Sequence, residues 1–398
     1  MLAIFGGTPV KTAKAPTWPQ ITDVDRAAVT AALREDLHGG RLRAAFEERF
    51  SADCSVKHCF AVANGTVSLE LILRGFGIGL GDEVILPPYT FVATLSSIVF
   101  TGATPVFADI DRGTYNISPA AVEAKITERT RAIVAVAVGG CPPDLDALEE
   151  IASRRGVKLI VDAAQAVGAE WRGRSICAYG DAASVSCQNT KNLTCGEGGI
   201  ITTNDDALAE RLALMLSGGV RDGKYVSVAQ EHGITELQAA LLSSQYEKLP
   251  DEIYRREKNA AYLSGRLHSL GFVSGMEYDE RITRHAYHLY LMRFDGDLLK
   301  EKGITKKQFL KAVAAEGVPL SAGYAPLYSF PCVSAQDTER MIGGRRIDGT
   351  PLPECERSAY GEGAWLYQAV LLEPRAEMDL IADALLKVWE HADDVRRI

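Results

Sequence analysis

The sequence predicts an α/β protein whose central sheet is mostly parallel and is followed by a smaller α+β domain. From about residue 60 to about residue 204, short β-branched runs alternate with longer helical patterns, as in crossover units on a sheet that helices cover on both faces. The strand-like runs are hydrophobic throughout, which is typical of strands buried on both sides. We therefore expect a large α/β domain over residues 1–250, with an N-terminal arm, and a small α+β domain over residues 251–398.

The elements of the large domain follow in pairs of strand and helix. Strand-like runs are "FAVAN", "DEVILPP", "TPVFADI", "RAIVAVAV", "VKLIVD", "DAASVSC" and "GGIITTN", and helical patterns are "GTVSLELILRGF", "TFVATLSSIVFTG", "PDLDALEEIASRRG" and "DDALAERLALMLSGG". Two separate helical patterns follow, one over 234–249 and a charged one from about Tyr254 to Leu270.

The small domain has a different pattern of predicted elements. Residues 286–294, "AYHLYLMRF", are strand-like, and Thr305 is a possible cap for an amphipathic helix over 305–317. A terminal helical pattern covers 377–392. Residues 334–354 are rich in glycine, proline and charge, so we expect a loop there.

Composition narrows the class of protein. The 398 residues carry a formal net charge of -9, so no general attraction to nucleic acid or to anionic lipid is expected. Eight cysteines without a CxxC pair argue against a zinc site and a disulfide framework, and favour reduced thiols in the cytoplasm. No apolar segment reaches the roughly 18 to 20 residues that cross a bilayer, so neither secretion nor membrane insertion is expected.

A possible phosphate site lies in "VANGTVSLELIL". Asn64, Gly65 and Thr66 stand between a strand and a helix, where free backbone N–H groups and the positive end of the helix dipole meet. A plain helix cap explains the same residues. No Walker lysine follows, so a nucleotide P-loop is not supported.

A carboxylate is expected at the ligand-binding edge of the sheet. Asp162 follows four apolar residues in "LIVDAAQAVGA", at the carboxyl end of a strand, where open α/β sheets bind ligands. A buried carboxylate there needs a partner, which is either a ligand or a structural group such as an arginine. Gln165 lies close enough to reach the same ligand or to cap the turn.

Lys191 is the candidate nucleophile. It stands in "VSCQNTKNLTCGEGGIIT" among small polar residues between two strand-like runs. Alone, such a lysine is usually solvated or structural. Phosphate cradle, strand-end aspartate and lysine, in this order, together suit pyridoxal phosphate, which needs an anion site, a carboxylate at its ring nitrogen and an amine for a Schiff base. Tyr89 and Phe91 offer a flat group over the ring, or are core aromatics.

With these residues, the sequence resembles the DegT/StrS-type aminotransferases, a family of fold-type I, pyridoxal-phosphate-dependent enzymes that act on keto-sugars and cyclitols. The resemblance runs nearly end to end and is carried by "LAIFGGTPV", "FAVANGTVSLELIL", "GDEVILPPYTFVATLSSIVFTGATPVFADID", "TYNISP", "PPDLDALEEIA", "LIVDAAQAVGAEWRGR", "SVSCQNTKNLTCGEGGIITTND", "TELQAALLSSQ" and "RHAYHLYLMRF". "SCQNTK", "RHAYHLY" and "LYQAVLL" are most similar to the branch with scyllo-inosose aminotransferases and 3-amino-5-hydroxybenzoate synthases.

The resemblance implies roles for single residues. Lys191 would hold the cofactor as a Schiff base and move the proton, and Asp162 would pair with the pyridinium nitrogen. The other cofactor contacts it implies are Gln165 to the ring hydroxyl, Phe91 stacked on the ring, and Gly65, Thr66 and Ser186 at the phosphate. His285, His288, Tyr324 and Tyr328 are candidates for the acceptor pocket, although core or surface roles are open for each.

Two positions depart from the family pattern. Glu231 to Ile234, "EHGI", replace an Asn-x-Arg-Met-like stretch that sends a phosphate contact into the neighbouring subunit, and an acidic residue there would repel a phosphate. Ala137 stands where the family has a histidine. These departures put three family features in doubt for this chain: cofactor binding, the dimer contact and the acceptor pocket.

The expected function is a transfer of an amino group from L-glutamate or L-glutamine to a cyclic keto-sugar or keto-cyclitol, in amino-sugar or antibiotic biosynthesis. Retention of Lys191 favours transamination, because the sugar dehydratases of the family carry histidine there. Two alternatives stay open: a dehydratase or aromatase of the aminohydroxybenzoate synthase type, and an accessory subunit without catalysis. The resemblance also implies a homodimer with active sites shared between subunits.

Overall fold

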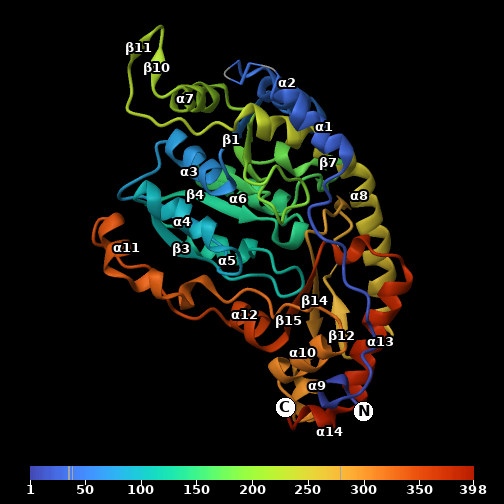
Figure 1. Ribbon diagram of the computed structural model, residues 1–398. Helices are drawn as coiled ribbons and strands as arrows, with labels where there is room; N and C mark the ends of the chain where they lie inside the picture. The colour runs from blue at the N-terminus through green and yellow to red at the C-terminus, as the bar shows by residue number, and fades with distance from the viewer. Residues whose placement is uncertain (35, 38, 278) are drawn as a thin grey trace.

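A mostly parallel sheet forms the centre of the protein (Figure 1). The computed structural model describes residues 1–34, 36–37, 39–277 and 279–398. Within them the sheet has seven strands in the order β1-β9-β8-β5-β4-β2-β3. Their bounds are β1 His58–Val62, β2 Glu83–Leu86, β3 Thr104–Phe107, β4 Thr130–Val136, β5 Lys158–Asp162, β8 Ala182–Ser186 and β9 Gly199–Thr203. Strands β3, β2, β4, β5 and β8 pair in parallel. Strand β9 pairs antiparallel with both of its neighbours, β8 and β1.

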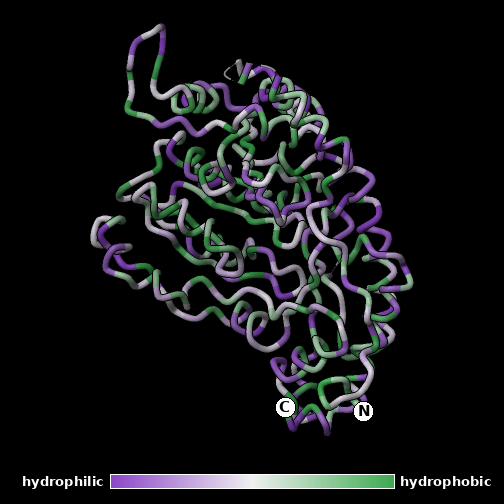
Figure 2. The backbone as a smooth tube through the Cα atoms, in the orientation of Figure 1, coloured by the Kyte–Doolittle hydropathy of each residue, from purple (hydrophilic) through white to green (hydrophobic). Residues whose placement is uncertain are grey.

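Helices cover both faces of this sheet, as the uniformly hydrophobic strands predict. One face packs on α3 (Gly65–Gly75), α4 (Val92–Thr101) and α7 (Asp206–Leu216), and the other on α5 (Pro119–Lys125) and α6 (Leu145–Arg155). Along β2, Val84 and Leu86 face the first layer while Ile85 faces the second, because successive side chains of a strand point to opposite faces. The tube in Figure 2 accordingly shows hydrophobic colouring along the inner strands.

A second apolar cluster lies below the sheet in Figure 1, around a small antiparallel sheet in the order β12-β14-β15. Its elements are β12 Val273–Gly275, β14 Leu289–Phe294, β15 Gly363–Tyr367, α9 Gly296–Glu301, α10 Lys306–Ala315, α13 Ala376–Glu390 and α14 Ala392–Val395. Thr305 caps α10 as expected, because its hydroxyl accepts the Gln308 N–H at 3.2 Å and the Gln308 side chain bonds back to the Thr305 N–H.

The N-terminal residues belong to this second cluster. Leu2 is fully buried in it, and the Ala3 N–H donates to the Glu316 carboxylate at 2.8 Å. Lys11 is buried and forms ion pairs with Glu373 and Glu377 at 2.7 and 2.6 Å. The N-terminal arm therefore begins beside the C-terminal helices and crosses to the central sheet. The division of the chain at residues 250 and 251 stays a prediction.

Short elements complete the chain. They are α1 Asp23–Ala32, α2 Arg41–Cys54, β6 Glu170–Trp171, β7 Arg174–Ser175, β10 Val220–Arg221, β11 Lys224–Tyr225, β13 Ile282–Arg284, α11 Gln336–Met341 and α12 Pro353–Glu356. The hairpin of β10 and β11 projects away from the body (Figure 1). None of the helices in the described part of the chain combines the length and hydrophobicity of a membrane span.

Three local predictions were wrong. Residues 234–270 form one helix, α8 (Glu236–His268), which continues through Pro250 because its buried side chains pack on both apolar clusters. Residues 334–354 contain α11 and the start of α12 instead of loop alone. The strand expected from residue 286 begins at Leu289, since the preceding residues turn toward the central sheet.

Pro250 gives the first testable prediction. It is exposed inside α8, where its ring removes the N–H that would bond to the Tyr246 carbonyl. Pro250→Ala should raise the free energy of unfolding by about 2 kcal/mol, less the stability lost because the unfolded chain gains conformational entropy. Pro353→Ala is the control, because proline is favoured at the first position of a helix such as α12. Denaturant unfolding followed by circular dichroism measures both; equal effects would contradict the account.

Candidate active site

Lys191 lies in the connection between β8 and β9. Its N–H donates to the Gln188 carbonyl at 2.9 Å, and its own carbonyl accepts the indole N–H of Trp18 at 3.0 Å. Both backbone groups of Lys191 are thus fixed. Burial lowers the pKa of Lys191 to about 8, and the negative charge of Asp162 opposes part of this shift. An amine with this pKa accepts and returns protons near neutral pH.

Asp162 is the last residue of β5 and its side chain is buried. The Thr94 hydroxyl donates to one carboxylate oxygen at 3.0 Å, and the Ala164 N–H donates to the other at 3.1 Å. Burial nevertheless raises the pKa of Asp162, against these two hydrogen bonds and the positive charge of Lys191. The carboxylate therefore stands where a cationic partner would stabilise it.

Gln165 is oriented by hydrogen bonds at both ends of its amide. Its oxygen accepts the Gly139 N–H at 2.7 Å, and its nitrogen donates to the Tyr324 hydroxyl at 3.0 Å. Tyr324 in turn meets the ring of Tyr89 edge-on at 5.6 Å between centroids. A Cβ on Gly323, where φ is +92°, would lie 2.5 Å from the Tyr89 hydroxyl, so glycine is required for this approach.

The expected phosphate cradle is at the N-terminus of α3. Asn64 caps the helix, accepting the Val67 N–H at 2.9 Å. The amides of Gly65 and Thr66 belong to the first turn, whose N–H groups have no acceptor within the helix. A Cβ on Gly65 would lie 2.8 Å from that of Ser186, so the end of β8 and the start of α3 are in contact. The structure thus places Ser186 beside Gly65 and Thr66, the residues that the resemblance assigns to the phosphate, and phosphate binding by them stays a prediction.

The aromatic candidates differ in exposure. Phe91 precedes α4 and is 56% exposed, so much of its surface is uncovered by the chain. Tyr89 is fully buried against Tyr115 and Tyr324. Stacking on a cofactor ring stays a prediction for Phe91, and Tyr89 is a core aromatic.

The two candidate histidines face different environments. His288 shares a 3.2 Å hydrogen bond with the side-chain oxygen of Asn192, the residue after Lys191. Burial, followed by the positive charges of Lys191 and Arg256, lowers the pKa of His288 well below its usual range. His285 lines a separate cavity on the far side of its backbone segment. Substrate contacts by either residue stay predictions.

Tyr328 lies away from Lys191. Its ring packs edge-on against Phe107, in the apolar cluster beneath α3 and α4. Its hydroxyl donates to the Glu356 carboxylate at 2.8 Å and accepts the Leu352 N–H at 3.1 Å. These contacts tie the segment before α12 to the large sheet, and a substrate role for Tyr328 stays a prediction.

Several residues around Lys191 were not predicted from the sequence. Trp18 reaches it from the N-terminal arm, and the guanidinium of the buried Arg256 lies 5.1 Å from the Trp18 ring centroid. Asn192 donates to the Ala286 carbonyl at 2.7 Å. Asn192 adjoins the lysine and could have been considered, whereas nothing in the sequence links residues 18 and 256 to residue 191.

The two departures from the family pattern occupy defined positions. The His232 carbonyl accepts the Ala63 N–H at 2.6 Å, and Gly233 forms a bridge to Val62. The "EHGI" segment thus lies beside the end of β1, next to the expected phosphate cradle. The side chain of Glu231 is exposed. Ala137 is fully buried, and its N–H donates to the Asp162 carbonyl at 3.0 Å. Effects of Glu231 and Ala137 on the chemistry stay predictions.

Comparisons with known proteins identify the family of the chain. Residues 19–342 match the DegT/DnrJ/EryC1/StrS aminotransferase family. A putative L-glutamine:3-amino-2,3-dideoxy-scyllo-inosose aminotransferase of Streptoalloteichus tenebrarius is 38% identical over 99% of both chains. An L-glutamine:2-deoxy-scyllo-inosose aminotransferase of the same organism is 36% identical over 99% of both. The crystal structure of 3-amino-5-hydroxybenzoic acid synthase superposes with a TM-score of 0.85 at 28% identity, covering 96% of this chain and 100% of that one.

The fold and the family match together define an aminotransferase of fold type I. The fold class expected from the sequence is thereby confirmed. The chain belongs to the DegT/DnrJ/EryC1/StrS aminotransferase family.

The pKa of Lys191 gives a prediction that needs no cofactor. In the cofactor-free protein, acetylation of Lys191 should reach half its maximal rate near pH 8, and Asp162→Asn should lower this midpoint, because the carboxylate raises the pKa of the lysine. Competitive labelling with quantification by mass spectrometry measures both. Asp181→Asn is the control, since Asp181 pairs with Lys158 instead, and should leave the midpoint unchanged. A midpoint that Asp162→Asn raises would contradict the assignment.

Proposed function

We propose that the protein transfers the amino group of L-glutamine or L-glutamate to a cyclic keto-sugar or keto-cyclitol, with pyridoxal phosphate as its cofactor. The observation that carries the proposal is the buried pair of Lys191 and Asp162, each within electrostatic range of the other. The acceptor class and the donor are taken from the relatives, whose names give L-glutamine and inosose substrates.

The residues present fit this cofactor. Asp162 is a buried carboxylate whose raised pKa reflects an incomplete set of stabilising partners, and a protonated ring nitrogen would complete it. Gly65, Thr66 and Ser186 would hold the phosphate at the helix N-terminus. Lys191 would take the aldehyde. When bound, the cofactor supplies an electron sink for the carbanion that forms on the amino donor.

The chain's own groups account for proton transfer and orientation. The Lys191 amine, with a pKa of about 8, would take the proton from the donor's α-carbon and, once protonated, act as the acid of the following step. Because Gln188 and Trp18 fix the backbone of Lys191, only its side chain needs to swing. Gln165 keeps the Tyr324 oxygen as an acceptor, so the Tyr324 O–H is left to donate to a substrate.

A homodimer in the cytoplasm is part of the same proposal. Tyr225 and Val228, on and next to the β10–β11 hairpin, are 84% and 104% exposed, and exposed apolar residues on a projecting hairpin suit a contact with a second copy. All eight cysteines are free, which favours a reducing compartment.

The direct test separates the two half-reactions. Protein loaded with pyridoxal phosphate and mixed with L-glutamine or L-glutamate, without a ketone, should release one equivalent of 2-oxo acid per site. A keto-cyclitol added next should be aminated, as mass spectrometry of the product would show. Lys191→Ala should lower both rates by at least about 10⁴-fold, because it removes the base and the covalent link.

The same assay distinguishes the alternatives. Formation of an aromatic product without any amino donor would favour the dehydratase or aromatase chemistry, towards which the likeness to 3-amino-5-hydroxybenzoic acid synthase points. Failure to bind pyridoxal phosphate at all would sink the proposal and favour an accessory subunit.

Gly65 provides a prediction on cofactor affinity. Gly65→Ala places a Cβ 2.8 Å from that of Ser186, so β8 and α3 must move apart and the phosphate site must widen. We expect affinity for pyridoxal phosphate to fall at least tenfold, about 1.4 kcal/mol, by fluorescence titration. Gly265→Ala, where a Cβ on α8 would meet open space, is the control; similar affinities for both variants would contradict the cradle.

A further inference from the structure

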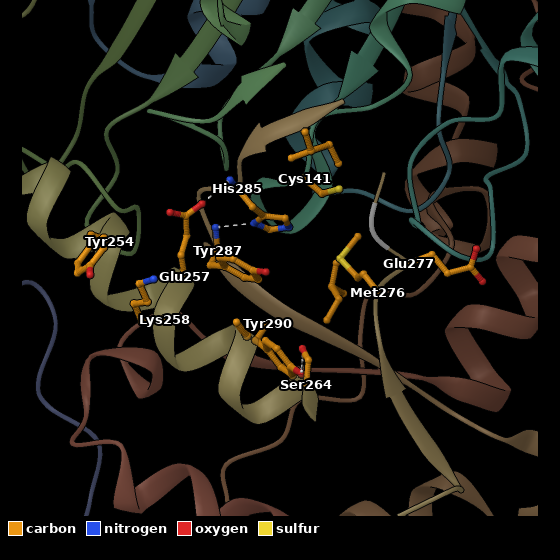
Figure 3. A pocket seen from close by; sticks show the side chains of 13 residues that line it. Cys141, Tyr254, Glu257, Lys258, Ser264, Met276, Glu277, His285, Tyr287 and Tyr290 are labelled. Atoms are coloured by element: carbon orange, nitrogen blue, oxygen red, sulfur yellow. Dashed lines mark hydrogen bonds between the residues drawn. The ribbon is translucent and has the colours of Figure 1, made fainter. Parts of the chain in front are cut away.

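A cavity of about 430 Å³ lies between α8 and the segment that leads into β14 (Figure 3). It is distinct from the site around Lys191 and has the size of a small-molecule site at the junction of two packed units. Its floor and walls include Cys141, Met276, His285, Tyr287 and Tyr290, and its α8 side includes Tyr254, Glu257, Lys258, Ala261 and Ser264.

His285 lines this cavity and carries an unpaired hydrogen-bond donor that is itself buried. Its ring is 4% exposed, and burial lowers its pKa to about 3, so it is neutral. The Tyr287 N–H donates to Nδ1 at 2.8 Å, which leaves the proton on Nε2. Among the described residues, Nε2 has no hydrogen-bond partner. A buried donor without an acceptor is costly, so the His285 ring would gain a hydrogen bond by turning this N–H, which is covered here, toward a ligand oxygen.

The side chains around His285 indicate which kind of ligand oxygen would bind there. Glu257 lies beside His285 and accepts its backbone N–H at 3.0 Å, so a ligand carboxylate would meet a like charge. A hydroxyl avoids this repulsion, and an ammonium would be attracted to Glu257 and Glu277, against which Lys258 is the one cation among the described residues that line the cavity. The rings of His285 and Tyr287 stack at 3.8 Å, and a hydroxyl pair, Ser264 and Tyr290, joins at 2.8 Å. Flat apolar surface and hydroxyl groups together suit a hydroxylated ring.

The cavity shares a wall with the active site. Between His285 and Tyr287, the Ala286 N–H donates to the Gly140 carbonyl at 3.1 Å, and the Ala286 carbonyl accepts from Asn192 at 2.7 Å. Asn192 follows Lys191, and Gly139 holds Gln165. A ligand that shifts the His285 segment therefore acts on both the lysine loop and the residue proposed to contact the cofactor ring.

We propose that this cavity is an effector site for a hydroxylated ring that carries an amine, an aminocyclitol or amino sugar. The ammonium binds Glu257, a ring hydroxyl accepts from His285 Nε2–H once the ring turns that group toward the cavity, and occupancy changes the setting of Lys191 through Ala286 and Asn192. The choice of ligand also rests on the proposed function, since amines of this class would be its products or their derivatives.

The experiment uses protein loaded with pyridoxal phosphate, with D-glucosamine as the probe and isothermal titration calorimetry as the readout. Glucosamine should bind at least tenfold more tightly than myo-inositol, which has ring hydroxyls but no amine. Ala261→Trp, which fills the cavity from the exposed side of α8, should weaken glucosamine binding at least tenfold. His268→Trp, exposed near the end of the same helix, is the matched control and should bind as the unmodified protein does.

His285→Asn tests the donor itself, because asparagine keeps an acceptor for the Tyr287 N–H but does not reach the position of Nε2. It should weaken glucosamine binding at least fivefold. Binding should also change the visible absorbance of the bound cofactor in the unmodified protein and not in Ala261→Trp. Equal affinities of Ala261→Trp and His268→Trp, or no binding of glucosamine, would overturn the inference. Binding without transamination would instead contradict the proposed function and leave the cavity assignment standing.

Discussion

A buried amine placed opposite a buried carboxylate is the constraint on which the site depends. Neither Lys191 nor Asp162 is well solvated, and burial shifts the pKa of each toward its neutral form. The fold keeps them together by placing Asp162 at the end of β5 and Lys191 after the neighbouring β8. Hydrogen bonds to the lysine backbone and to the carboxylate then leave the amine as the mobile group. This arrangement makes the amine more reactive near neutral pH than the amine of an exposed ion pair would be.

Local sequence predicted the sheet and the place of Asp162 at its edge because their causes are local. Hydrophobic runs of strand length predict buried strands, and a polar residue directly after such a run must lie at the sheet edge, as Asp162 does. Capping is similarly short in range, so Thr305 was identified correctly. The cradle at Gly65 also depends only on a strand meeting a helix.

Predictions that depended on distant contacts were less successful. Proline breaks most isolated helices, yet α8 continues through Pro250 because burial on both sides of that residue outweighs one lost hydrogen bond. The contact of Trp18 with the Lys191 carbonyl and the burial of Arg256 are tertiary. No spacing in the sequence encodes them.

The N-terminal arm makes the active site depend on the end of the chain. Ala3 and Lys11 are anchored to Glu316 and Glu373, and the same arm continues to Trp18 at Lys191. During synthesis on the ribosome, those anchors emerge long after the arm itself. Ala3 and Lys11 therefore have no docking partner while the central sheet is being made, and the arm is held at both of its ends only when translation is nearly finished. Complete anchoring of the arm beside Lys191 is in this sense a late step of folding.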